Sequence, residues 1–145
     1  MRLFRLLPVV VIAGCTTQDV AQPTGRAMFQ SYPDALFEAF ESACGGPAQT
    51  FNRPNPDVVE CREYLPPEAT AALILSFDGT TEDLPELVIR FQAQAADAGY
   101  LVENDVFVSV PQKDGRRVQV RREDHKLMRT LDKLYERAGG VPSPS

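Results

Sequence analysis

Residues 100–122 have the sequence YLVENDVFVSVPQKDGRRVQVRR, and this stretch decides the fold class. Its side chains divide between two faces with the two-residue period of a strand. Val106, Val108 and Val110 lie opposite Phe107 and Ser109 in the first arm, and Val118 and Val120 lie opposite Arg117, Gln119 and Arg121 in the second. Lys113-Asp114-Gly115 separates the arms, and an Asp-Gly pair tolerates the positive φ angles of a tight turn. The sequence therefore predicts an antiparallel hairpin with arms over about 100–111 and 116–122.

Two segments outside this hairpin have the spacing of amphipathic helices. In 31–46 the large apolar residues fall on one helical face, and Gly45-Gly46-Pro47 ends the run. In 123–138 the apolar residues again share one face, and Gly139-Gly140 follows them. Both helices are expected to pack that face against a sheet.

The middle of the chain supplies the remaining predicted elements. Residues 57–65, DVVECREYL, alternate as a strand does, and residues 69–77, ATAALILSF, are almost continuously apolar, as expected of a central strand. Residues 83–99 place apolar side chains at helical spacing and end at a glycine, which predicts a helix. A right-handed crossover is expected from 69–77 through this helix into the hairpin.

The resulting order is α-β-β-α-β-β-α, which predicts an α+β fold in two layers. A small, mostly antiparallel sheet of about four strands would carry two or three helices on one face. The 145 residues suffice for one compact domain, expected over 31–139. Residues 15–30 are interpreted as a flexible tether, and residues 140–145 as a disordered polar tail.

The first 15 residues, MRLFRLLPVVVIAGC, have the organisation of an export signal. Arg2 and Arg5 precede an apolar run that would rise only about 12 Å as a helix, against a hydrocarbon core of roughly 30 Å. The run ends in Ile12-Ala13-Gly14-Cys15, and this tetrapeptide resembles the lipobox of bacterial lipoproteins. The resemblance implies removal of residues 1–14 as a signal peptide, a diacylglyceryl group on the Cys15 sulfur, and a further acyl chain such as palmitate on the new amino terminus.

The same resemblance implies a location. Thr16 follows the cysteine, where the inner-membrane retention signal of these lipoproteins places Asp. The implied destination is the periplasmic leaflet of an outer membrane, with the inner membrane as the exception. Two acyl chains suffice for stable attachment, so three would hold the chain permanently. An ordinary signal peptide in which Cys15 is incidental is the alternative.

Cys44 and Cys61 are the two cysteines that remain if Cys15 carries lipid. Exported proteins fold in an oxidising compartment, which favours a structural disulfide between them. Two buried thiols that never meet are the alternative. Their spacing is not that of a Cys-x-x-Cys motif, so thioredoxin-type exchange is not expected.

Composition argues against most catalytic and metal chemistry. The single histidine, His125, follows Asp124, but no Gly-x-Ser-x-Gly elbow accompanies the pair, so a membrane-tethered hydrolase using His125 is only the alternative function. A zinc site would need several His or Cys ligands. No metal or cofactor is predicted. One group of acidic residues lacks calcium-loop spacing and is interpreted as favourable charge at a helix start: Asp78, Glu82, Asp83 and Glu86.

The charge of the chain changes sign along its length. The formal net charge of −5 argues against general nucleic-acid binding. Residues 15–105 carry −11, whereas residues 106–145 carry +4. The cations of the hairpin and the last helix form a candidate docking patch: Lys113, Arg117, Arg121, Lys126, Arg129, Lys133 and Arg137. This patch is either a solvated face paired with the acidic half, or a surface for anionic lipid, cell-wall carboxylates or an acidic envelope protein.

These observations together predict an exported, lipid-anchored protein of a bacterial envelope. We expect a non-catalytic adaptor, assembly factor or binding module rather than an enzyme.

Overall fold

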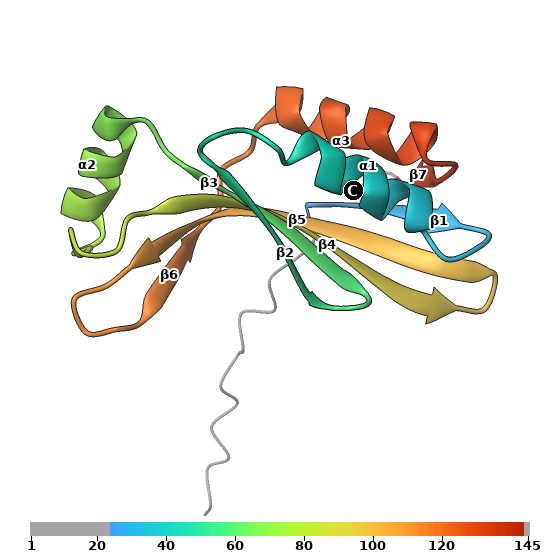
Figure 1. Cartoon of the computed structure of the whole chain (residues 1–145), viewed down its shortest axis with the longest axis horizontal. Helices are drawn as coiled ribbons and strands as arrows, with labels where there is room; N and C mark the ends of the chain where they lie inside the picture. Colours follow the sequence, from blue (N-terminus) through green and yellow to red (C-terminus); the bar gives the residue numbers. More distant parts are fainter. Residues whose placement is uncertain (1–23, 144–145) are drawn as a thin grey trace, which may run out of the picture.

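The computed structural model describes residues 24–143, which form three helices and a seven-stranded sheet (Figure 1). All strand pairs are antiparallel, in the order β2-β3-β4-β5-β1-β7, and β6 also pairs with β5. In chain order the elements are β1 (Gly25–Phe29), α1 (Asp34–Ala43), β2 (Gln49–Asn55), β3 (Val58–Tyr64), α2 (Pro67–Ser76), β4 (Glu86–Ala96), β5 (Gly99–Pro111), β6 (Arg117–Val120), α3 (His125–Arg137) and β7 (Val141–Ser143).

The helices are distributed unevenly over the sheet. α1 and α3 lie side by side on one face of the sheet, and α2 stands apart at the other end of the molecule, near β6 (Figure 1). The opposite face of the sheet carries no helix among the described residues (Figure 1). The fold is therefore α+β in two layers, as the sequence predicts.

An aromatic cluster joins the helices to the sheet. Phe40 of α1 and Tyr135 of α3 both meet Phe91 of β4 edge-on, with ring centroids 4.8 and 5.4 Å apart respectively. Phe29 of β1 packs edge-on against Tyr135 at 6.2 Å. Edge-to-face contacts of this kind stabilise a core beyond the area they bury. The four rings thus tie both helices and two strands into one core.

Strand β5 pairs with three other strands. One edge pairs with β4, and the other edge is divided between β1 and β6. Residues 100–104 pair with β1, whereas residues 108–111 pair with β6. Thr24 lies between the two pairings, where its Oγ1 accepts a hydrogen bond of 2.9 Å from the Val106 N–H. The chain therefore enters the sheet at the middle of β5.

Several predicted elements are confirmed. The helices predicted over 31–46 and 123–138 are α1 and α3, and the strand predicted over 57–65 is β3. The hairpin is formed by β5 and β6, and Gly115 in its turn has a φ of +84°. In these segments the spacing of apolar side chains is regular, and turn residues such as glycine and proline mark the ends.

Two predicted elements are wrong: the predicted strand is a helix, and the predicted helix is a strand. Residues 69–77 lie mostly in helix α2, and residues 83–99 contain strand β4. A short apolar run fits a buried strand or a helix equally well, and here the alanines and Pro67 at the helix start favour the helix. In β4 the buried Phe91 and Ala93 alternate with exposed glutamines, which is a strand period. No parallel crossover forms, because the strands of the described chain pair antiparallel throughout.

The predicted domain limits and strand number are also corrected. β1 lies inside the predicted tether 15–30, β7 lies inside the predicted tail 140–145, and β2 was not predicted at all. The sheet therefore has seven strands rather than about four, and the order is β-α-β-β-α-β-β-β-α-β. These three strands are short or polar, and they acquire their conformation from pairing with a neighbour.

Candidate functional site

The disulfide between Cys44 and Cys61 is present and structural. Cys44 ends α1, Cys61 lies within β3, and their Cα atoms are 5.8 Å apart. Both side chains are 7% exposed and belong to the hydrophobic core. The bond therefore fixes the end of a helix to the sheet, and its burial shields it from thiol exchange.

The predicted patch of cations is divided by the structure into two parts. In the hairpin, Lys113 pairs with Asp78 at 2.5 Å and Arg121 pairs with Asp105 at 2.7 Å. The Arg117 guanidinium likewise pairs with an acidic side chain, the Asp83 carboxylate. The cations of the hairpin are thus matched by the acidic part of the chain.

The same pairs correct the interpretation of the acidic group at 78–86. Asp78 and Asp83 lie in the loop between α2 and β4, and Glu86 is the first residue of β4, where its carboxylate pairs with Arg62 at 3.2 Å. No helix starts there, because the predicted helix 83–99 is a strand. Asp78, Asp83 and Glu86 thus hold this loop and strand to cations of the hairpin and of β3.

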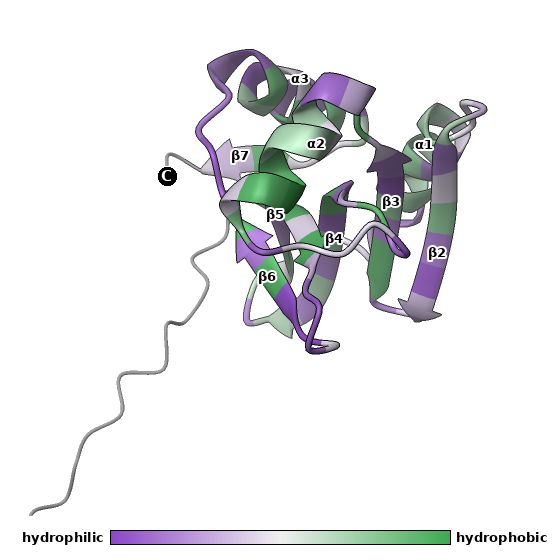
Figure 2. Ribbon diagram, turned by 90° about the vertical axis from the view of Figure 1, so that its left-hand side faces the viewer, coloured by the Kyte–Doolittle hydropathy of each residue, from purple (hydrophilic) through white to green (hydrophobic). Residues whose placement is uncertain are grey.

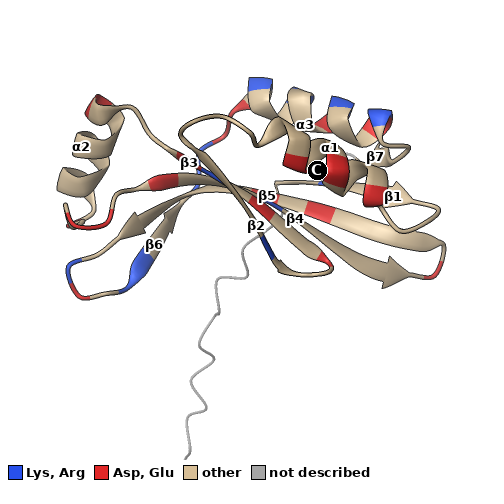
Figure 3. Ribbon diagram, in the orientation of Figure 1, with Lys and Arg blue, Asp and Glu red and all other residues tan. Residues whose placement is uncertain are grey.

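The second part of the patch lies along α3. Its four cations are exposed, and none of them forms an ion pair with another residue of the described chain: Lys126, Arg129, Lys133 and Arg137. Figure 3 shows them along α3, with acidic residues along the neighbouring α1. We call these four residues the α3 stripe.

His125 is the exposed first residue of α3, and its neighbour Asp124 is the helix N-cap. The Asp124 Oδ1 accepts hydrogen bonds of 2.9 Å from the backbone N–H groups of Lys126 and Leu127. The hydrogen bond from Leu127, followed by that from Lys126, holds the pKa of Asp124 below its usual range. Helix capping therefore explains the presence of Asp124 beside His125.

The sheet face without helices carries a charged network that sequence reasoning missed. Glu60 is only 5% exposed, and its carboxylate pairs with Arg62 at 2.9 Å and with Arg90 at 2.6 Å. Phe107 is 3% exposed, with the guanidinium groups of Arg90 and Arg121 both 5.4 Å from its ring centroid. Stacked guanidinium groups can cover an aromatic ring and still reach water. Paired charged side chains therefore cover this face of the sheet.

The most apolar exposed surface lies around α2. Thr70 is the one buried residue of this helix, and Leu75 is 84% exposed. Figure 2 shows hydrophobic residues along α2 and in part of β6. We call this region, comprising α2, the loop 77–85 and the hairpin 111–120, the α2 end. A helix that is apolar and largely exposed indicates a contact surface.

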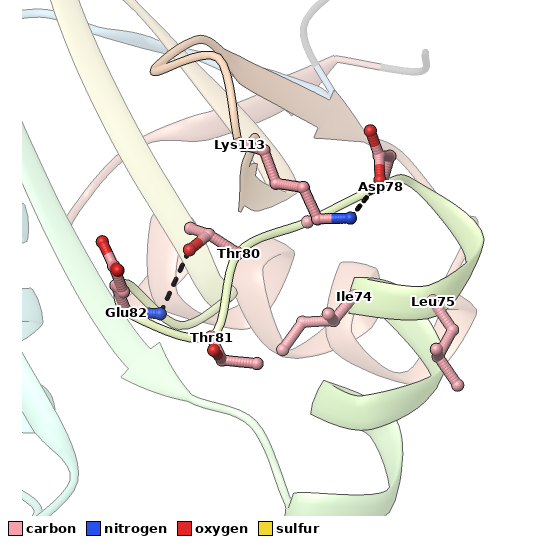
Figure 4. Close-up of a pocket in the computed structure, with 8 residues that line it drawn as sticks. Ile74, Leu75, Asp78, Thr80, Thr81, Glu82 and Lys113 are labelled. Carbon is pink, nitrogen blue, oxygen red and sulfur yellow. Dashed lines mark hydrogen bonds and ion pairs between the residues drawn. The ribbon is translucent and has the colours of Figure 1, made fainter.

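An open hollow of about 480 Å³ lies within the α2 end (Figure 4). Ile74 and Leu75 line its apolar side, and the ion pair between Asp78 and Lys113 crosses its edge. Thr80 accepts a hydrogen bond of 3.1 Å from the Glu82 N–H on the other side. The hollow is thus a shallow part of the apolar surface, with polar groups that already bond to one another.

Two findings on residues 24–143 and the comparisons with known proteins complete this description. None of the described helices has the length and apolar character needed to cross a bilayer. Residues 24–143 contain no group of three or more His, Cys, Asp or Glu side chains placed to hold a metal ion. No protein-family model, curated protein or solved structure matches this chain. Cys15 and the lipobox lie outside the described residues.

Proposed function

We propose that this chain is an exported lipoprotein of a bacterial envelope, held to the membrane by lipid on Cys15. The observation that carries the proposal is the sequence MRLFRLLPVVVIAGC, in which two arginines, an apolar run and a lipobox follow one another in order. The disulfide between Cys44 and Cys61 supports it, since such bonds persist in oxidising compartments. The proposed location is the periplasmic leaflet of the outer membrane.

The proposed activity is that of a non-catalytic adaptor or binding module. The α3 stripe supports this part, because its cations remain free to meet an acidic envelope protein or the carboxylates of the cell wall. The hairpin cations are excluded from this role by their ion pairs with acidic residues of the same chain. The proposed docking surface is thus narrower than the seven residues predicted from the sequence.

Lipidation is tested by the intact mass of the mature protein and by the Cys15→Ser variant. We expect the wild-type chain to begin at Cys15, to carry the mass of the acyl groups and to fractionate with outer membranes. The Cys15→Ser variant should lose the acyl mass and either leave the membrane fraction or remain uncleaved. A mature wild-type chain with an unmodified amino terminus would overturn the proposal.

Docking is tested by charge reversal on the α3 stripe. The Arg129→Glu/Lys133→Glu variant should lose salt-sensitive retention on envelope components, since interactions between exposed charges are screened by salt. Arg116→Glu/Lys113→Glu is the control, because it makes the same change of charge in the hairpin. Equal retention of both variants and the wild type would show that the α3 stripe is only a solvated face.

A further inference from the structure

We propose that the α2 end of the domain lies against the bilayer that holds the lipid anchor. This inference rests on the proposed function, because it requires an acylated Cys15. It assigns a lipid surface to a region whose apolar residues are otherwise left in water. It also gives the tethered domain a preferred orientation on the membrane.

Exposed apolar side chains concentrate at this end of the molecule. Leu75 and Phe77 are exposed at the end of α2, and Val118 is exposed on β6. Leu84, in the loop before β4, and Tyr64, the last residue of β3, are also exposed. Apolar surface of this kind is favourably removed from water, whether by lipid or by protein.

The shape of this region favours a bilayer over a protein groove. α2 projects from the end of the sheet (Figures 1 and 2). A protein partner must supply a matching concave surface, as the close packing of interface cores requires. A fluid bilayer accepts a projecting apolar helix without such a match. A projecting apolar helix is therefore better suited to lipid.

The position of the tether places the membrane within reach of α2. Only residues 16–23 separate Cys15 from Thr24, so the anchor lies at most about 30 Å from the sheet. Thr24 bonds to Val106, which is about 17 Å along β5 from Pro111. The Pro111 carbonyl accepts a hydrogen bond from the backbone N–H of Thr80, in the loop that follows α2. The tether is thus long enough for the anchor to insert into a bilayer that touches the α2 end.

A short tether also lowers the affinity that this contact needs. Once the anchor is inserted, docking of the α2 end is intramolecular, and the effective concentration of bilayer is high. A few apolar side chains then suffice to favour the docked state. No separate membrane-binding motif is required.

The charges around α2 permit this contact. No Lys or Arg occurs between Arg62 and Arg90, but three of the six acidic side chains of that stretch are neutralised by cations outside it: Asp78, Asp83 and Glu86. The other three form no ion pair within the described chain. Glu63 accepts a hydrogen bond of 3.0 Å from the Gln49 side chain, and Glu68 and Glu82 would remain at the level of the headgroups. Repulsion from an anionic leaflet is therefore limited to few groups.

The absence of tryptophan from the sequence allows a site-specific test. The Leu75→Trp variant places one fluorophore on α2, and Val141→Trp places one on β7, where the native side chain is 68% exposed. Both full-length lipidated chains are reconstituted into vesicles of phosphatidylethanolamine with a minor fraction of phosphatidylglycerol. Acyl chains brominated near the headgroup serve as contact quenchers.

We expect the emission of the Leu75→Trp variant to shift to the blue and to be quenched by brominated lipid. The emission of the Val141→Trp variant should change in neither respect. A Phe77→Trp variant repeats the measurement at a second exposed position, and circular dichroism checks that each variant is folded. Lipidated Leu75→Trp and Phe77→Trp chains that behave like the Val141→Trp chain would overturn the inference.

The outcomes separate this inference from the proposed function. If intact mass shows the acyl groups but brominated lipid quenches neither α2 variant, the anchor stands and the membrane contact fails. If intact mass shows no acyl groups, the proposed anchor fails, and the inference fails with it. A blue shift that appears without vesicles and grows with protein concentration would identify a second copy of the chain as the occupant, and would also overturn the inference.

Discussion

Replacing Cys44 and Cys61 by alanine should lower the free energy of unfolding by about 3 kcal/mol. The bond closes a loop with a sequence separation of 17 residues, and the chain-entropy model assigns about 3 kcal/mol to a loop of that size. For a domain of this length, such a loss corresponds to a fall of roughly 10–15 °C in Tm. Both cysteines lie in the core, so the lost sulfur contacts add to this value.

The two single variants distinguish the bond from ordinary packing. Either Cys44→Ala or Cys61→Ala alone removes the bond, so each should cost nearly as much as the double variant. Independent packing contributions would instead add. Urea denaturation followed by circular dichroism measures all three free energies, and reduced wild type provides a fourth. Single-variant losses that sum to the loss of the double variant would refute this reasoning, as would two titratable thiols in the native wild type.

Three further predictions concern individual side chains and turns. Tyr135→Phe should cost about 1–3 kcal/mol of unfolding free energy, because the phenol donates a 2.9 Å hydrogen bond to the buried Asn104; an unchanged urea midpoint would contradict this. Gly99→Ala should destabilise far more than Gly115→Ala in thermal melts, since Gly99 has a φ of +130° and an added Cβ would lie 2.1 Å from a backbone oxygen of β1, whereas a Cβ at Gly115 meets nothing within 4 Å. The lowered pKa of Asp124 means that its contribution is complete at neutral pH and is lost as the pH falls below about 4. The Asp124→Ala variant should therefore have a lower free energy of unfolding than the wild type at neutral pH, and unfolding curves should show this difference shrinking in acid. A difference that is constant with pH would refute this.

The sequence correctly predicts the elements in which the hydrophobic period and the residues at both ends indicate the same structure. It fails where the conformation of a segment depends on pairing or packing with distant residues. The turn at Lys113-Asp114-Gly115 and the glycines after the two amphipathic helices mark boundaries locally, so the hairpin, α1 and α3 are confirmed. Nothing local distinguishes the apolar run 69–77 from a strand, because its conformation depends on what packs against it. β1 and β7 are strands because they pair with each other and β1 with β5. Such partners are far away in sequence.

The charged surfaces illustrate the same limit. The stripe along α3 follows from helical spacing, which one segment contains. The network around Glu60 requires the register of three strands, which places Glu60 opposite Arg90. Its only local trace is that Glu60 and Arg62 share the side of β3 opposite the buried Val59 and Cys61. Similarly, the pairing of Asp78 with Lys113 depends on a contact between two loops.

The position of β1 in the sheet has a consequence for the order in which the domain can form. β1 is the first strand to leave a ribosome, yet it lies between β5 and β7. Arg26 pairs with Ser143, over a hundred residues later in the chain. Contacts this distant close slowly, because a long loop must be ordered first. The edge of β1 that meets β5 thus stays unpaired until residues 100–104 have been made, and the edge that meets β7 stays unpaired until residues 141–143 have been made, so a nascent chain needs protection for that time.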